Sequence, residues 1–489
     1  MTDETMTEET LTEEPRKRRS LFLTVGGAVV ILAVLAALGW WAHALASDFR
    51  VTSAESDETQ PGTITVQLDQ GQLAYACPPG VVDPASPSLQ MDDVDLLAAA
   101  ESEVYELTDG GFGVRVDTSA VGESASTVPL AFAGSESGDR TSFLPSSCML
   151  PATELVLPAG STVTGEDTVL ILSNPSATPV SVRVYVLSPL GSLDGLDAGQ
   201  DVLVPAESTV SVLPAIWASG EARLSLLLQA DGLGIAAWLQ SSGLDGEVPQ
   251  GLGRLQAQVP STEVLFLGMD AQPDGVLRIA NPSTSSTDVT VSVLSQGTTV
   301  PLSGADTVGV EGRSVFDVEL GSLSDDAAAL VVQSETPVAA AITESSAGEP
   351  FAEDPSINVG LRTLIGSATP LERVVLPSLK EMEEASAALG TELEGVQLVL
   401  ANAGEQSDTV HIGERSVWVE AGSVLLADLS SGSQNEGESL ELWTENSASL
   451  FAVMVFEGQT NAGLTRSVVA LPQDGASRAQ QQILLRPYR

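Results

Sequence analysis

Histidine is the first residue type to consider, because general-base catalysis near neutral pH normally uses its side chain. The 489-residue chain has two histidines, His43 and His411. His43 adjoins a long apolar run, so a Ser-His-Asp or Cys-His arrangement would have to use His411. His411 follows Asp408-Thr409-Val410 in a strand-like stretch, and the chain has no Gly-x-Ser-x-Gly element. We therefore interpret His411 as a surface residue of a strand and predict that the protein is not an enzyme.

Tryptophan is the second residue type with a possible role, because sugar-binding clefts use aromatic platforms. The 66 acidic residues offer many carboxylate pairs of the kind that hydrolyse glycosides, but abundance alone selects no pair. Trp238 lies in an apolar run and is expected in a core. Trp418 alternates with Val417 and Val419, so it faces the other side of its strand. Together with Trp443, it is the candidate binding surface.

Charge and composition exclude several other classes of function. The formal net charge is −46, which rules out nucleic acid as a direct partner because phosphate is bound by basic surfaces. Two cysteines and two histidines are too few to supply the ligands of structural zinc, haem or iron–sulfur clusters. We therefore expect no cofactor and no metal site.

The N-terminal segment predicts a membrane anchor. Residues 16–19 are basic, and Leu21–Ala42 contains no charged side chain. At about 1.5 Å per residue, a helix of this length spans a hydrocarbon core of roughly 30 Å. The basic cluster before the span and Trp40-Trp41 at its end place the N-terminus inside and the bulk of the chain outside the cytoplasmic membrane. The alternative is a signal peptide cleaved after Ala46.

The two cysteines, Cys77 and Cys148, both follow this span and are therefore expected in an oxidising compartment. An even pair in such a compartment is best interpreted as one disulfide. It would close a loop of about 70 residues and stabilise the first exported domain by roughly 4 kcal/mol. The alternative is a pair of free thiols at a metal or redox site, which lacks CxxC spacing and a nearby histidine.

Three copies of one long pattern follow. Each copy begins with an apolar strand that ends in asparagine, namely Asn174, Asn281 and Asn402. In the first two copies the next residues are Pro and Ser, so we expect Pro to end the strand and Asn to hydrogen-bond the backbone of the turn. Pro in the middle position also disqualifies these sites as glycosylation acceptors.

Later elements recur in the same order in each copy. A Val-x-Val-x-x-x-Ser segment precedes two apolar runs joined by a short turn, and we interpret each pair of runs as a β-hairpin. The three pairs are residues 224–229 with 235–240, 330–333 with 338–343, and 440–444 with 450–456. Apolar segments such as Val374–Leu376 are expected to close a copy.

The spacing of these strands predicts the fold class. About six or seven short strands in roughly 100–120 residues favour an antiparallel sandwich of immunoglobulin-like size, whereas a β-propeller, the alternative, repeats every 40–50 residues or so. The sequence therefore predicts an all-β protein with a single N-terminal transmembrane helix followed by tandem immunoglobulin-like β-sandwich domains.

The predicted organisation follows from these assignments. Residues 349–372 are expected to form an irregular connection, and residues 380–394 a short acidic helix on the surface. The expected segments are a cytoplasmic tail 1–20, the transmembrane helix 21–42, a linker 43–62, a divergent β domain with the disulfide 63–161, β-sandwich repeats 162–268, 269–379 and 396–473, an acidic insert 380–395 and a C-terminal tail 474–489.

Four features follow one another in this chain: a strand that ends in Asn-Pro-Ser, an alternating valine strand, a Val-x-Val-x-x-x-Ser segment and the segment Val332–Ala340. In this order of features the chain resembles an uncharacterised family of exported, membrane-anchored actinobacterial proteins with tandem β-sandwich repeats. The resemblance covers residues 150–470, the anchor and Cys77-Pro78-Pro79. It implies an envelope location and carries no established activity. The third copy departs from the pattern, since Ala403 takes the place of proline.

Location and composition together lead to a functional expectation. We expect a non-enzymatic, membrane-anchored cell-envelope protein that contacts the membrane through its N-terminal helix and binds or scaffolds an envelope protein or glycan. The alternative is a carbohydrate-binding or carbohydrate-processing ectodomain.

Overall fold

The computed structural model describes residues 63–65, 72–90, 94–98, 102–117, 128–136, 138–192, 198–270, 274–295, 297–321, 329–371, 373–429, 439–444, 449–471 and 482–484. The predicted tail, anchor and linker, residues 1–62, lie outside these ranges. Within the ranges, no helix has the length and apolar character needed to cross a membrane. The chain divides into two units. The first is Met1–Leu68 with Gln480–Arg489, where β1 (Thr63–Thr65) pairs with β36 (Gln482–Leu484), and the second is Asp69–Ala479.

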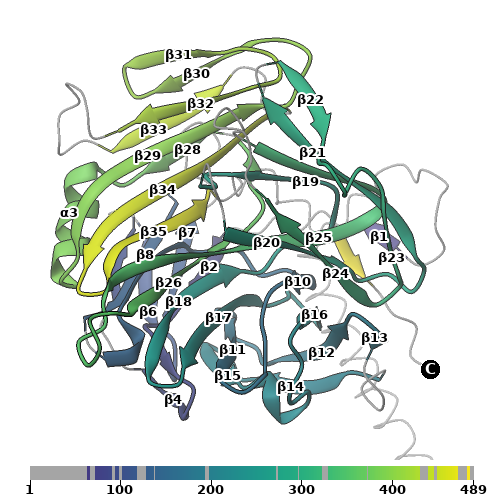
Figure 1. Ribbon diagram of the computed structural model, residues 1–489, viewed down its shortest axis with the longest axis vertical. Helices are drawn as coiled ribbons and strands as arrows, with labels where there is room; N and C mark the ends of the chain where they lie inside the picture. Colours follow the sequence, from purple (N-terminus) through teal and green to yellow (C-terminus); the bar gives the residue numbers. More distant parts are fainter. Residues whose placement is uncertain are drawn as a thin grey trace, which may run out of the picture. The chain divides into compact units, whose positions relative to one another are not determined.

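Strands make up most of the second unit (Figure 1), and the predicted all-β class is confirmed. Sequence alternation explains them: in β12 (Val180–Ser188), Val180, Val182 and Val184 are buried, while Arg183 between them is exposed. A pattern that repeats every two residues is typical of a strand, in which successive side chains point to opposite faces of the sheet. The described ranges contain one α-helix, α3 (Leu379–Ala388).

The first described module of the second unit holds the disulfide. Cys77 and Cys148 are bonded, as predicted, with their Cα atoms 4.3 Å apart, and both side chains are fully buried beside Val114 and Ala131. Its sheets run β2-β7-β6, β5-β8-β9 and β3-β4. The strands are β2 (Gln72–Cys77), β3 (Val82–Asp83), β4 (Ser86–Gln90), β5 (Val94–Leu97), β6 (Glu103–Glu106), β7 (Phe112–Asp117), β8 (Leu130–Ser135) and β9 (Ser142–Ser147).

The first copy of the repeat consists of two sheets around one apolar core. One sheet has the order β15-β11-β17-β18, and the other contains β10-β16-β12-β14. Leu170 and Trp238 of the first sheet pack in the same core as Val182 and Leu226 of the second. The remaining strands are β10 (Glu154–Leu157), β11 (Glu166–Asn174), β13 (Gly191–Ser192), β14 (Gln200–Val204), β15 (Ser208–Val212), β16 (Ser225–Ala230), β17 (Ala236–Asp245) and β18 (Val248–Gln256).

The second copy repeats this pairing order. Its sheets are β24-β20-β25-β26 and β19-β25-β21, with β22 and β23 both paired to β21. A single long strand, β25, therefore belongs to both sheets. The strands are β19 (Ser261–Leu267), β20 (Asp274–Asn281), β21 (Thr287–Ser295), β22 (Thr298–Pro301), β23 (Val308–Val310), β24 (Ser314–Leu320), β25 (Ala329–Pro350) and β26 (Asn358–Ile365).

The third copy has the same order again, with sheets β32-β29-β34-β35 and β28-β33-β30-β31. Figure 1 shows these two sheets in green and yellow, with α3 at the edge of the first. The strands are β27 (Thr369–Pro370), β28 (Val374–Leu376), β29 (Glu392–Asn402), β30 (Asp408–Ile412), β31 (Arg415–Val419), β32 (Ser423–Asp428), β33 (Leu440–Thr444), β34 (Leu450–Thr460) and β35 (Gly463–Ala470).

All three predicted hairpins are wrong. β16 pairs with β10 and β12, whereas β17 pairs with β11 and β18, so the chain crosses from one sheet to the other. β33 and β34 are related in the same way. In the second copy both runs belong to β25, which passes continuously between the sheets. Two apolar runs around a turn look alike in both geometries, because the turn residues do not specify which sheet receives the second strand.

Two further expectations fail for reasons visible in the contacts. The supposedly irregular stretch 349–372 contains β26, which pairs with β25. Its Gly360 and Arg362 resemble loop residues, but Gly360 packs against Gln250, and the Arg362 guanidinium binds the carboxylate of Glu166 in the first copy. The segment Val374–Leu376 opens the third copy instead of closing the second, because it pairs with β33.

The acidic helix predicted in residues 380–394 is present in part: α3 ends at Ala388, and residues 392–394 belong to β29. Ser378 caps its first turn: the Ser378 hydroxyl accepts from the backbone N–H of Glu381, whose carboxylate accepts from the backbone N–H of Ser378. Such a capping box satisfies two of the free donors at a helix start. The helix is not wholly on the surface, since Met382 and Ala385 are buried in the core of the third copy.

A buried asparagine ends the first long strand of each copy. Asn281 Nδ2 donates to the carbonyl oxygens of Ser285, Val310 and Glu311 at 2.8, 3.1 and 3.1 Å. Asn281 Oδ1 accepts from the backbone N and the hydroxyl of Ser283 at 3.0 and 2.7 Å. The expected bond to the following turn is thus confirmed. The amide also reaches a second turn, which precedes β24.

The other two copies use their asparagine in the same way. Asn174 makes the equivalent bonds to Ser176, Thr178, Val204 and Pro205. Asn402 donates to Gln406 and Val419 and accepts from the N–H of Gly404, so the third turn forms without proline. All three asparagines are 0% exposed.

The second turn fixed by each asparagine contacts the preceding module. Its central residue has a left-handed backbone, with φ of 47° at Glu207, 56° at Arg313 and 65° at Gly422. The contacts are Thr108 N donating to Glu207 O at 2.9 Å, the Arg313 guanidinium 4.5 Å from the Tyr185 ring centre, and Gly297 N donating to Gly422 O at 2.9 Å. The asparagine amide therefore fixes a turn that belongs to its own copy and also contacts the neighbouring module.

Replacing Asn281 by alanine removes five hydrogen bonds made by a side chain that is 0% exposed. We expect a loss of roughly 3 kcal/mol or more in unfolding free energy, since each hydrogen bond contributes about 0.5–1.5 kcal/mol. Urea unfolding of the full chain in detergent measures this loss. The matched control is Asn358→Ala, because Asn358 is exposed and donates a single bond, to Gly348 O. Equal losses in the two variants would contradict the role of Asn281.

Removing the disulfide by Cys148→Ser should destabilise the first module by roughly 4 kcal/mol on the chain-entropy model. Amide hydrogen exchange is expected to accelerate in β2 and β7, which the disulfide holds beside β9, and to remain slow in β29 and β34 of the third copy. Non-reducing peptide mapping of the wild type should recover Cys77 linked to Cys148. Alkylation of both thiols in the native protein would refute the pairing.

Candidate functional site

The outer face of one sheet in the third copy carries aromatic side chains. In β30 and β33, Val410, Ile412 and Leu442 are 0% exposed and point into the core, so the residues between them face outward. His411 and Trp443 are register partners on this outward side. Their rings stack with centroids 3.7 Å apart and planes inclined by 9°. The two strands thus hold the imidazole and the indole stacked face to face.

Trp418 lies on the same face. It is on the edge strand β31, where its register partner in β30 is Thr409, while that of Ser416 is His411. Because alternate residues of a strand share a face, Trp418 lies on the side of the sheet that carries His411. Its side chain is 62% exposed, one of the largest exposed apolar groups of the described residues. We call Trp418, His411 and Trp443 the aromatic face.

The polar surroundings of the aromatic face are also defined. Glu441 precedes Trp443 by two residues and therefore shares its side of β33. Its Oε1 accepts from Arg373 Nε at 2.6 Å, which forms an ion pair beside the rings. Glu414 and Glu420, at the two ends of β31, are exposed. The rings are thus accompanied by carboxylates that can accept hydrogen bonds.

His411 makes one contact that resembles part of a catalytic arrangement. The Ser416 hydroxyl lies 3.0 Å from His411 Nδ1. A triad also needs a carboxylate on the other ring nitrogen, and no carboxylate within the described ranges is hydrogen-bonded to His411. The nearby Asp408 is buried, with its carboxylate bound by Thr409 N and the Thr444 hydroxyl at 2.7 Å each. Ser416 therefore fixes the orientation of the imidazole ring on the sheet.

The remaining candidate residues lie elsewhere. Trp238 is 0% exposed in the core of the first copy, where its apolar run predicted it. Trp217 is half-buried against the same core. In the part of the chain that the structure describes, no cluster of three or more His, Cys, Asp and Glu residues is arranged to hold a metal ion.

The structure adds His411 to the predicted pair of Trp418 and Trp443. From its residue type alone, His411 was a candidate only for a catalytic base and had no evident connection with the tryptophans. The short turn Gly413-Glu414 between two alternating strands could have shown that His411 and Trp418 share a face. A two-residue hairpin loop fixes the pairing of Ile412 with Arg415. That pairing already places His411 and Trp418 on one face.

Comparison with known proteins gives one match. Residues 104–416, which make up well over half of the chain, match a family of unknown function, DUF5719. No curated protein and no solved structure matches the chain. The matched region includes His411 and ends before Trp418 and Trp443. The match agrees with the resemblance to an uncharacterised family, and the chain belongs to the DUF5719 family of unknown function.

Proposed function

We propose that this protein is a non-catalytic binding module of the cell envelope. In this proposal, residues 21–42 anchor it in the cytoplasmic membrane and the tandem β-sandwich copies, of immunoglobulin-like type, extend outside, as in the exported actinobacterial proteins that the sequence resembles. The aromatic face is the surface that contacts an envelope protein or glycan. The observation that carries the proposal is the placement of the exposed Trp418 and the half-buried His411 and Trp443 on the same outer face of one sheet.

The location is supported by the disulfide and by the charge. Structural disulfides persist in oxidising compartments outside the cytoplasm, and Cys77–Cys148 is fully buried within the first module. The basic cluster before residues 21–42 predicts the same location, because it places the rest of the chain outside the cytoplasmic membrane. A net charge of −46 disfavours attachment to anionic lipid headgroups by the folded part, so the apolar span is the proposed link to the membrane.

The binding role is supported by the chemistry of the aromatic face. Tryptophan is enriched among the residues that contribute most to binding energy at protein interfaces, and Trp418 leaves 62% of its surface in solvent. Stacking against Trp443 and the bond from Ser416 hold the imidazole of His411 in one orientation. A rigid surface of this kind loses little conformational freedom when a partner binds.

Carbohydrate binding is the second candidate for the same face. It is favoured by Trp418, whose indole is 62% exposed and offers a ring surface to the apolar side of a sugar. Exposed carboxylates of Glu414 and Glu420 lie close in the chain and can accept bonds from sugar hydroxyls. The function in both cases is recognition of an envelope component.

A photo-crosslinking amino acid at position 418 should capture the partner in living cells. The same reagent at position 426 is the control, since Leu426 is 61% exposed on β32 in the other sheet of the same copy. We expect a discrete adduct from position 418 alone, and mass spectrometry will identify it as protein or glycan. Adducts of equal yield from both positions, or none from position 418, would argue against the aromatic face.

The topology makes a separate prediction. Protease added to intact cells stripped of their wall should digest residues 47–489 and leave a short N-terminal fragment with the membrane. The reason is that the basic cluster at 16–19 retains the N-terminus inside. An epitope tag at each end, read by immunoblotting, measures the outcome. Full protection of the C-terminal tag would refute the orientation.

A further inference from the structure

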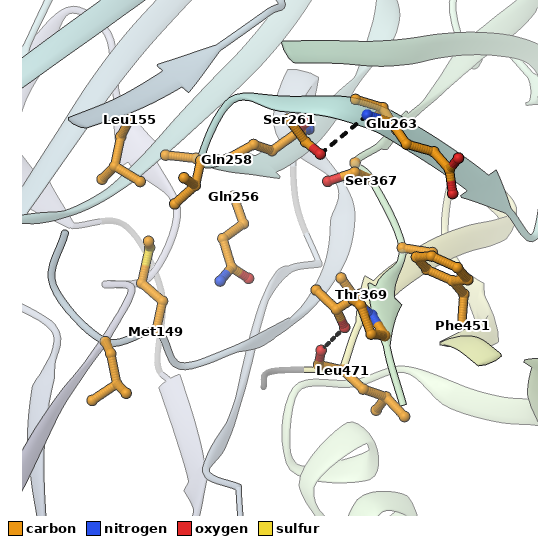
Figure 2. Close-up of a pocket in the computed structure, with 18 of the residues that line it drawn as sticks. Met149, Leu155, Gln256, Gln258, Ser261, Glu263, Ser367, Thr369, Phe451 and Leu471 are labelled. Atoms are coloured by element: carbon orange, nitrogen blue, oxygen red, sulfur yellow. Dashed lines mark hydrogen bonds between the residues drawn. The ribbon is translucent and has the colours of Figure 1, made fainter. Parts of the chain in front are cut away.

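A cavity of about 330 Å³ lies where parts of all four modules of the second unit meet. Figure 2 shows Met149 and Leu155 on one side, Thr369 and Phe451 on the other, and Gln256 between them. These residues come from the first module, the first copy and the third copy, and β19 of the second copy supplies the upper wall. The volume falls in the range of roughly 300–1,000 Å³ found for small-molecule sites.

One polar group of the lining has no partner. Gln258, just beyond β18, is 9% exposed, and no described residue accepts a hydrogen bond from its buried Nε2. This nitrogen lies 3.3 Å from the position that a Cβ would occupy on Gly366, which also lines the cavity. The amide therefore lies at the cavity wall. A buried N–H₂ group without an acceptor is costly, so its site favours a molecule that supplies one.

Three other polar side chains of the lining have hydrogen-bond partners. Gln256 Oε1 accepts from the Ser147 hydroxyl at 2.9 Å, and the Thr369 hydroxyl donates to Leu471 O. Glu263 is exposed at the rim, where its carboxylate accepts from Gln333 Nε2 at 2.9 Å. Gln258 Nε2 differs from these groups, because it is a buried donor for which no described residue supplies an acceptor.

The rest of the wall determines the charge of the occupant. Met149, Leu155, Val264 and Phe451 give a largely apolar lining, and water gains few hydrogen bonds in such a space. Among the described residues of the lining there is no lysine or arginine to balance an anion, and the one carboxylate, that of Glu263, lies exposed at the rim, where water screens its charge. An ion would therefore lose hydration without compensation.

We propose that this cavity binds a small neutral ligand that carries an amide. The carbonyl oxygen of the ligand accepts from Gln258 Nε2, and its apolar part packs against Met149, Leu155 and Phe451. Val259 is 53% exposed beside Gln258, so the ligand enters from solvent between β18 and β19. This site is distinct from the aromatic face, and its test is independent of the proposed function.

Three probes with one apolar body test the assignment. N-acetyl-leucinamide is neutral, N-acetyl-leucine carries a carboxylate, and leucinamide carries an ammonium group. The readout is the methyl resonance of Met149 in the full chain labelled at methionine, with Met269, which does not line the cavity, as the internal reference. We expect a saturable shift of Met149 with the neutral probe and at least tenfold weaker binding of both charged probes.

Two variants identify the atoms involved. Gln258→Leu removes the donor and should weaken binding of N-acetyl-leucinamide about tenfold. Gly366→Leu fills the space and should abolish it, whereas Gly321→Leu, at an exposed site with no atom near its added Cβ, should leave it unchanged. An unchanged Met269 resonance shows that each variant is folded.

The proposal is overturned by any of three results. The first is a Met149 resonance that does not move with N-acetyl-leucinamide up to its solubility limit. The second is equal affinity for the neutral and the charged probes. The third is unchanged affinity in a folded Gln258→Leu variant.

Discussion

The buried asparagine amide at the end of the first long strand is the interaction on which the rest of this structure depends. Only Asn offers a carbonyl acceptor and two N–H donors on so short a side chain: aspartate lacks the donors and glutamine is one methylene longer. In each copy the amide oxygen closes the turn after the strand, and the amide nitrogen holds the turn before β15, β24 or β32. That second turn then contacts the preceding module.

Arginine supplies the second kind of link between modules. The chain has only 20 basic residues, yet besides Arg313 on Tyr185, five described arginines form hydrogen bonds with a neighbouring module: Arg115 to Glu207, Arg254 to Pro79 and Gly80, Arg278 to Gly160 and Leu224, Arg362 to Glu166, and Arg466 to Met269. Burial lowers the pKa of the Arg254 guanidinium to about 10, so it stays charged at neutral pH. Its two carbonyl acceptors compensate that buried charge. Acidic side chains therefore predominate among the charged groups on the surface.

These links bear on both proposed sites. The cavity exists only where modules are held together, since its walls come from the first module and all three copies. The aromatic face instead belongs to a single sheet of the third copy and requires only the register of β33, β30 and β31. One site therefore depends on the assembly of the modules, and the other on the local fold of one copy.

The sequence predicted the local structure better than the pairing of strands. Valine alternation and the three asparagines located the strands around each asparagine, and the side of Trp418 followed from Val417 and Val419. Strand partners were not predictable, because buried runs on both sides of a turn are compatible with a hairpin and with a crossing between sheets. β26 was missed since Gly360 and Arg362 serve contacts with the first copy. The sequence did not mark Gln258 as a candidate binding residue. Whether a buried amide lacks a hydrogen-bond partner is known only once the residues around it are placed.

The central claim is that the aromatic face recognises an envelope component, and co-sedimentation tests it most directly. The full-length chain, purified in detergent, is mixed with envelope fragments from cells that lack the protein, and bound and free chain are separated by centrifugation. The account predicts saturable binding of the wild type and of Leu426→Ala, and at least tenfold weaker binding of the double variant Trp418→Ala/Trp443→Ala. Equal binding of the wild type and a folded double variant would contradict it.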